Sequence, residues 1–249
     1  MSSSSSSSSD NNCIEQPQGY APLGTRVTLP LPDDFHHHAR DGDQTAAILQ
    51  HTASRFGRCL LMPNLKTPGP VTTTQAAMDY QQHVRHSVPP HHASTFVPLM
   101  TLYLTDRTTP EEIHVAAAAN EAHGSNIVGC KYYPAGATTN SEFGVTDIRH
   151  CYPALHAMVQ HNFMLCIHSE VTHADIFERE PVFIQEIMKP LVADFPDLKI
   201  TMEHISTKEA VEYVWQAPDT VKATITCHHL LYNRNGTFPT QFGMIRSSE

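Results

Sequence analysis

Short apolar runs alternate with stretches of helical character along most of this chain, and this alternation restricts the fold more than any other feature of the sequence. The stretches with helical spacing or helix caps are residues 43–57, 109–124, 180–195 and 206–216. The apolar runs expected to form strands are "RVTLPL", "RCLLMPN", "STFVPLMTLYL", "NIVGCKYYP", "FMLCIHSE", "LKITMEH" and "ATITCHHLL". Strands that alternate with helices predict right-handed βαβ units and a parallel sheet. Seven strands are one short of a closed (β/α)8 barrel.

The composition narrows the classes of protein. A net charge of −9 argues against a nucleic-acid partner, which usually meets a basic face. No run approaches the ~18 apolar residues that a membrane span needs. The six cysteines form no C-x-x-C pair, which predicts reduced thiols in a cytoplasmic protein. The serine run makes residues 1–25 an expected disordered tail, without the features of a targeting signal.

Histidine is unusually abundant, because 18 histidines outnumber 16 lysines and arginines. Polar residues that suit chemistry also stand at the ends of apolar runs, which in a (β/α) barrel is the catalytic side. These residues are His36, His38, Asn64, Lys131, His168 and His204. His36 and His38 are expected to point to one face of a strand and His37 to the other. The pair is either a pair of metal ligands or two satisfied polar residues, and four histidines at equivalent strand ends favour ligands.

Lys131 ends the buried run "IVGCK". A charged, unpaired lysine is costly there. It either forms a buried salt bridge, extends its charged end to solvent, or loses its proton and reacts with carbon dioxide. The resulting carbamate is a carboxylate on a long stem that can bridge two metal ions.

Several motifs carry a family resemblance, and they appear in order. The sequences "PDDFHHHARDGD", "MPNL", "KYYPAGATTN", "HSEVTHADIFERE", "EHIST" and "NRN" closely resemble the monofunctional dihydroorotases of the amidohydrolase superfamily. The resemblance runs from about residue 26 to residue 235, which would be one TIM-type metal-dependent hydrolase barrel with strands 1–7. The last residues, 236–249, resemble nothing in the family.

The resemblance implies a site with two zinc ions. His36 and His38 match the ligands of the more buried metal, and His168 and His204 match those of the second. Lys131 matches the lysine that is carboxylated and bridges both. The substrate-side matches are Arg40 and Asn64, which would bind the substrate carboxylate, and Thr138 and Thr139 in a flexible loop. His36, His38 and Arg40 are expected to alternate onto one strand face, which would place the metal beside the carboxylate anchor. The activity implied is the reversible hydrolysis of (S)-dihydroorotate to N-carbamoyl-L-aspartate, in de novo pyrimidine synthesis, by a homodimer.

The sequence also departs from the family pattern. The family's eighth strand ends in a Gly-Thr-Asp-Ser-Ala-Pro-His motif whose aspartate binds the buried metal and acts as general acid and base. That motif is absent, so an incomplete barrel with little activity is expected. Ser169 replaces the usual glycine. His228 and His229 are either structural or close to substrate.

Two other functions remain open at this point. One is a hydantoinase-like cyclic amidohydrolase, which would share the metal ligands. The pair Arg40 and Asn64 and the "PAGATTN" loop argue against it. The other is a truncated, inactive chain that acts as a binding or scaffold protein, which the absent aspartate favours.

Overall fold

The computed structural model describes residues 24–233. The chain divides into two units, Met1–Pro30 and Leu31–Glu249. In the first unit, the described residues 24–30 are exposed and form no helix or strand. The predicted tails, 1–25 and 236–249, lie largely outside the described residues, and the domain bounds stay a prediction.

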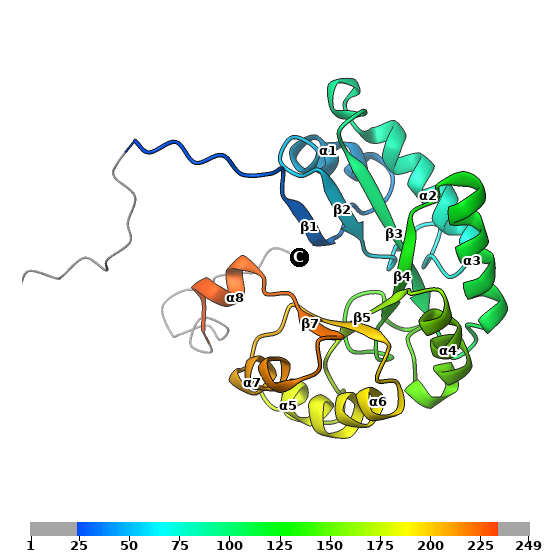
Figure 1. Ribbon diagram of the computed structural model, residues 1–249, viewed down its shortest axis with the longest axis vertical. Coiled ribbons are helices and arrows are strands. Elements are labelled where there is room, and N and C mark those ends of the chain that lie inside the picture. Colours follow the sequence, from blue (N-terminus) through cyan, green and yellow to red (C-terminus); the bar gives the residue numbers. More distant parts are fainter. Residues whose placement is uncertain (1–23, 234–249) are drawn as a thin grey trace, which may run out of the picture. The chain divides into compact units, whose positions relative to one another are not determined.

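Seven parallel strands form one sheet in the second unit, and they are neighbours in the order in which they occur along the chain. The strands are β1 (Asp33–His37), β2 (Arg58–Leu61), β3 (Val97–Leu104), β4 (Ile127–Tyr132), β5 (Met164–His168), β6 (Lys199–Glu203) and β7 (Val221–Ala223). Figure 1 shows the sheet curling with the helices on its outer side. Strands β1 and β7 are its two edges. The fold is therefore the predicted α/β barrel of TIM type, with seven of its eight strands among residues 24–233.

Helices connect successive strands. They are α1 (Asp43–Thr52), α2 (Thr74–Ser87), α3 (Pro110–His123), α4 (Tyr152–Gln160), α5 (Arg179–Phe183), α6 (Lys189–Asp194) and α7 (Lys208–Gln216). The helix α8 (Cys227–Leu231) follows β7, the last described strand. The turns η1 (Pro90–His92) and η2 (Ile148–Cys151) are 3-10 helical, and η3 (Ile184–Met188) is a π-helical turn between α5 and α6.

The ends of α3 follow from local chemistry. The hydroxyl of Thr109 accepts a hydrogen bond from the backbone N–H of Glu112, and Pro110 occupies the first turn, where its missing N–H costs nothing. Gly124 ends the helix in the left-handed conformation, at φ 60°. Both ends of α3 agree with the helical stretch 109–124 predicted from the sequence.

Alternate residues of each strand face opposite sides of the sheet. One set joins the main core under the helices, as Cys59, Cys130, Leu165 and Met202 do. The other set forms a small inner cluster of Leu60, Met62 and Cys166. Burial on both sides explains why these strands are continuously apolar.

Two predicted strands differ from the structure. Residues 26–31 form no strand, and β1 begins at Asp33, after Pro30 and Pro32, which lack the N–H that a sheet ladder needs. The run 223–231 ends its strand at Ala223 and then turns into α8. β7 pairs with β6 on one side only, and among the described residues no strand lies on its other side to extend the sheet.

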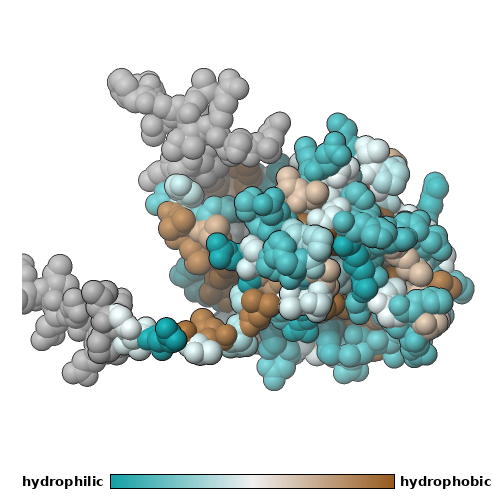
Figure 2. Space-filling view, turned by 90° about the horizontal axis from the view of Figure 1, so that it is seen from above, coloured by the Kyte–Doolittle hydropathy of each residue, from teal (hydrophilic) through white to brown (hydrophobic). Residues whose placement is uncertain are grey.

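Helices α2 and α4 are not among the helices predicted above. In α2 most residues are polar, and the apolar stripe that faces the core is narrow, with Ala77, Tyr80 and Val84 buried. The surface shown in Figure 2 is largely hydrophilic, with scattered hydrophobic areas. In residues 24–233 no helix has the length and apolar character to cross a membrane.

Candidate metal centre

Strand parity brings the predicted residues to the inner face of the sheet. Because Cys130 and Ile167 belong to the core under the helices, their neighbours Lys131 and His168 face inward. Met202 likewise places Glu203 on the inner face. The site therefore lies on the concave side, at the carboxyl ends of β1, β4, β5 and β6.

Four histidines meet there in two pairs. His36 Nε2 lies 3.3 Å from His38 Nε2, and His168 Nδ1 lies 3.2 Å from His204 Nε2. The two pairs are neighbours, because the ring centroids of His36 and His204 are 5.1 Å apart. Burial and nearby positive charge lower the pKa of His38 to about 3, and the pKa of His36 and His204 is lowered for the same main reason. Neutral imidazoles with converging nitrogens are suited to metal binding.

The spacing of these nitrogens suits tetrahedral zinc. Two nitrogens bound at 2.0–2.1 Å to one tetrahedral zinc ion stand about 3.3 Å from each other. The measured separations of 3.3 Å and 3.2 Å match that value. The donor set and its geometry therefore fit a two-metal site held by His36, His38, His168 and His204.

Lys131 is fully buried and lies close to these histidines. Its Nζ has no hydrogen-bond partner among residues 24–233 and stands 5.2 Å from the centre of the Tyr133 ring. Burial lowers the pKa of Lys131, against the opposing effect of the Glu203 carboxylate. A buried amine without a partner is costly. A group added to Nζ, or a metal beside it, would resolve that cost.

Glu203 belongs to the site, although the sequence argument did not single it out. Its side chain is fully buried, and its Oε2 accepts a 2.6 Å hydrogen bond from His36 Nδ1 and a 2.9 Å bond from Thr224 Oγ1. Burial alone would raise the pKa of Glu203, but the bond from His36 and the charge of Lys131 hold it below its usual value. The available signal was a carboxylate at the end of the strand-like run "LKITME", in which apolar residues alternate with polar ones.

The residues matched to the substrate carboxylate lie beside the centre. Arg40 is exposed, and its charge helps to lower the pKa of His38. Strand alternation does not put it there, because β1 ends at His37 and Arg40 has a left-handed backbone, at φ 61°. The expectation that His36, His38 and Arg40 share one strand face is therefore wrong for Arg40.

Asn64 is buried and connected to the loop that contains Thr138 and Thr139. Its Nδ2 donates to the carbonyl of Thr139 at 3.1 Å, and Asn140 Nδ2 donates back to the carbonyl of Asn64 at 3.0 Å. Both threonines of the loop are exposed. Their role as a lid over substrate stays a prediction.

The adjacent pair His228 and His229 lies in α8. His228 is exposed and contacts the Thr226 hydroxyl at 3.1 Å. His229 is partly buried, and this burial lowers its pKa against the opposing effect of the backbone of Ile205 and His204. The structure thus places His229, rather than His228, next to the metal-centre segment.

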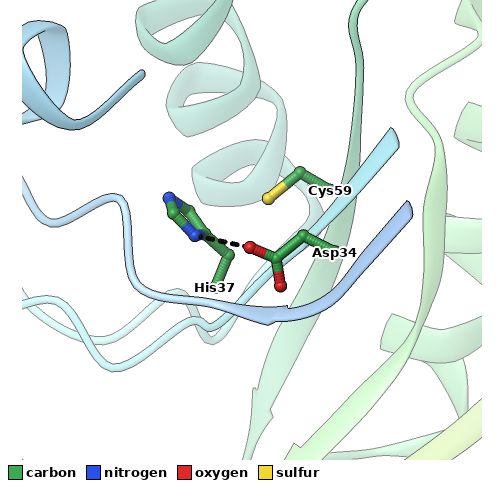
Figure 3. A group of neighbouring side chains, drawn as sticks. All are labelled: Asp34, His37 and Cys59. Atoms are coloured by element: carbon green, nitrogen blue, oxygen red, sulfur yellow. Dashed lines mark hydrogen bonds and ion pairs between the residues drawn. The ribbon is translucent and has the colours of Figure 1, made fainter. Parts of the chain in front are cut away.

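A second group of possible ligands lies on the opposite face of the sheet. Asp34, His37 and Cys59 have potential ligand atoms within 4.8 Å of one another (Figure 3). His37 uses one nitrogen to contact Asp34 at 3.0 Å and the other to contact Thr52 at 3.2 Å. Burial raises the pKa of the Cys59 thiol, whereas metals bind the thiolate. These side chains are better explained as a network that joins β1 to α1.

Comparisons with known proteins identify the relatives of this chain. No family model matches it. A dihydroorotase from Cupriavidus taiwanensis is 53% identical over 215 residues, which are 86% of this chain and 60% of the relative. A dihydroorotase from Teredinibacter turnerae is 51% identical over 211 residues, 84% of this chain and 58% of the relative.

Solved structures give the same result. The crystal structure of dihydroorotase from Campylobacter jejuni is 35% identical with a TM-score of 0.71, and the match covers 81% of this chain and 55% of that one. The Saccharomyces cerevisiae dihydroorotase in complex with 5-fluoroorotic acid is 31% identical with a TM-score of 0.73, covering 84% and 59%. An L-hydantoinase from Arthrobacter aurescens shares the fold, at 15% identity and a TM-score of 0.62.

A curved parallel sheet with histidines and a buried lysine at the carboxyl ends of its strands defines a class by its fold, the α/β barrels of TIM type. The relatives and solved structures named above that match this chain at 31–53% identity are dihydroorotases. The chain spans about 60% of the length of the curated relatives that it matches.

Proposed function

We propose that this chain carries the metal-binding and substrate-binding part of a dihydroorotase, which hydrolyses (S)-dihydroorotate reversibly to N-carbamoyl-L-aspartate in pyrimidine synthesis. The observation that carries the proposal is the pair of converging histidine contacts, at 3.3 Å and 3.2 Å, beside a buried lysine amine without a partner. The hydantoinase alternative is not favoured, because that likeness is one of fold alone. Homodimer formation and a cytoplasmic location are further predictions of the resemblance and the cysteine pattern.

Each residue would have a distinct role. His36 and His38 would hold one zinc ion, and His168 and His204 the other. Lys131, as a neutral amine, would attack carbon dioxide and release a proton, which leaves a carbamate able to bridge the two ions. Bound zinc would supply a water of lowered pKa and would polarise the scissile carbonyl. Arg40 and Asn64 would bind the substrate carboxylate and orient the ring, because the arginine fork suits a carboxylate.

The first test concerns the metal. We expect the purified chain to bind zinc, and the double variant His36→Ala, His38→Ala to lose the ion that these two residues hold, because two of its ligands are gone. Metal content by plasma emission spectroscopy measures the loss. The variant Glu178→Ala, at an exposed position in the turn before α5, is the control. Undiminished zinc in the double variant would refute the metal centre.

The second test concerns the substrate. We expect the zinc-loaded chain to bind dihydroorotate more tightly than dihydrouracil, which has the same ring without the carboxylate. Calorimetric titration measures both ligands. Equal affinity would refute the carboxylate-binding role and would reopen the hydantoinase alternative. Formation of N-carbamoyl-L-aspartate is measured in parallel, with and without zinc. The motif with the family's general acid/base aspartate is absent from this sequence. Such a residue typically raises the rate ~10²–10⁴-fold, so we expect these residues to turn over substrate much more slowly than a relative that has the aspartate.

A further inference from the structure

Glu203 and Thr224 form a hydrogen-bonded connection between the two histidine pairs. Glu203 Oε2 accepts from His36 Nδ1 at 2.6 Å and from Thr224 Oγ1 at 2.9 Å. The same Thr224 hydroxyl accepts a hydrogen bond from the backbone N–H of His204 at 2.8 Å. A hydroxyl has one proton to give and lone pairs to receive, so both contacts can be made at once.

The connection ends at His36 and His204. His36 needs a fixed tautomer, and His204 needs its backbone held in a strained conformation. A carboxylate only accepts hydrogen bonds, so His36 must carry its proton on Nδ1 and leave a lone pair on Nε2, the atom that faces His38. His204 has a positive φ of 44°, a conformation that residues with a side chain rarely adopt. Its N–H is held by Thr224 while its Nε2 faces His168.

Thr224 is itself fixed in place by the sheet. Its N–H donates to the carbonyl of Met202 at 2.9 Å, and its carbonyl accepts from the N–H of Ile205 at 2.9 Å. These bonds continue the ladder between β6 and β7 past the last strand residue. The hydroxyl therefore has a defined position between Glu203 and His204, which is what a rigid support for metal ligands requires.

We infer that Glu203 and Thr224 are positioning residues of the metal centre: Glu203 sets the tautomer and orientation of His36, and Thr224 couples it to the backbone of His204. The inference rests on the proposed function, because it assigns the histidines to metal ions. It assigns no contact with substrate to either residue. A carboxylate behind a metal-binding histidine is typically worth about 10- to 100-fold in metal affinity.

The first experiment reads the tautomer of His36 without metal and without substitution of Glu203. In ¹⁵N-histidine-labelled, metal-free protein, two-bond ¹H–¹⁵N spectra distinguish Nδ1–H from Nε2–H imidazoles, and a His36→Gln variant assigns the His36 signals. We expect the Nδ1–H form. The Nε2–H form would overturn the inference, whatever the variants below show.

The second experiment measures zinc affinity by competition with a chromophoric chelator. We expect Glu203→Ala to weaken binding about 10- to 100-fold, and Thr224→Val to weaken it by a smaller factor. Thr224→Ser, which keeps the hydroxyl, should restore the parent affinity. The matched control is Thr220→Val, since Thr220 lies just before β7 and, in the described chain, its hydroxyl donates to the Pro196 carbonyl and not to the metal-centre residues. Cobalt substitution adds a visible spectrum that reports altered ligand geometry.

The outcomes separate the two proposals. If zinc is unaffected by His36→Ala, His38→Ala, the proposed function fails. If that double variant loses zinc but Glu203→Ala and Thr224→Val bind it as the parent does, only the positioning role fails. Should Glu203→Ala not fold, as judged by circular dichroism, the Thr224 series and the His36 tautomer still decide the matter.

Discussion

Glu180 is expected to hold together the segment that carries His204. It lies in α5, is 6% exposed, and accepts three hydrogen bonds from the start of α7. The donors are the backbone N–H of Ser206 at 3.1 Å, the backbone N–H of Thr207 at 2.8 Å and the Thr207 hydroxyl at 2.6 Å. Replacing Glu180 by alanine removes the acceptor of all three bonds. The donors lie two and three residues after His204, whose backbone is strained.

The expected loss can be bounded. A hydrogen bond to a charged group contributes about 1.5–3 kcal/mol, but the donors freed here lie partly in solvent, which replaces some of the interaction. We therefore expect Glu180→Ala to lower the free energy of unfolding by about 2–4 kcal/mol. For a chain of this size that corresponds to about 5–15 °C in Tm. Glu180→Gln keeps an acceptor oxygen and should stay within about 1 kcal/mol of the parent.

The assay is urea unfolding followed by far-ultraviolet circular dichroism. Glu178→Ala, two residues away and exposed, is the control and should change stability by less than about 0.5 kcal/mol. A loss in Glu180→Ala no larger than that of the control would refute the reasoning. The parent and the glutamine variant should also differ in their pH dependence.

The sign of that pH dependence follows from burial. Burial raises the pKa of Glu180 above 4.5, against the lowering effect of the bonds from Thr207 and Ser206. The folded state then holds the proton more tightly than the unfolded state does. This contribution to stability is complete below the unfolded pKa and is lost as pH rises through the folded pKa. The stability of the parent relative to Glu180→Gln should therefore fall as pH increases from about 4.5.

Three further predictions concern the site, the sheet and the thiols. Arg40→Ala should weaken dihydroorotate binding about 10- to 100-fold in calorimetric titration and leave zinc content unchanged; unchanged affinity would contradict the carboxylate role. Gly129→Ala should lower the free energy of unfolding, measured in urea, by roughly 1–3 kcal/mol or more, because a Cβ there would lie 2.0 Å from the Met164 carbonyl oxygen. A variant as stable as the parent would show that β4 and β5 can move apart. Among the described cysteines, Cys227 alone is exposed, so Cys227→Ser should remove one rapidly reacting equivalent in thiol titration of the native protein, and an unchanged count would contradict the exposure of Cys227.

The sequence by itself determined the elements that depend on short-range patterns. Strands β2 to β6 lie within the predicted apolar runs, and α3 begins after Thr109 and ends at Gly124, because caps and apolar periodicity act within a few residues. The placement of Lys131 and His168 at strand ends also follows from the order of strands along the chain. Their assignment as metal ligands stays a prediction of the family resemblance.

Tertiary structure alone decided the contacts that join distant segments. His36 and Glu203 are 167 residues apart in the sequence and are joined by a hydrogen bond in the structure. No local sequence pattern predicts which histidine a buried glutamate will contact. The left-handed backbone of Arg40 and the turn of 227–231 into α8 likewise overrode the strand patterns predicted for them. Local preferences are worth only tenths of a kcal/mol to about 1 kcal/mol per residue. Whether a given strand end gains a partner depends on which strand lies beside it, and only the folded sheet settles that.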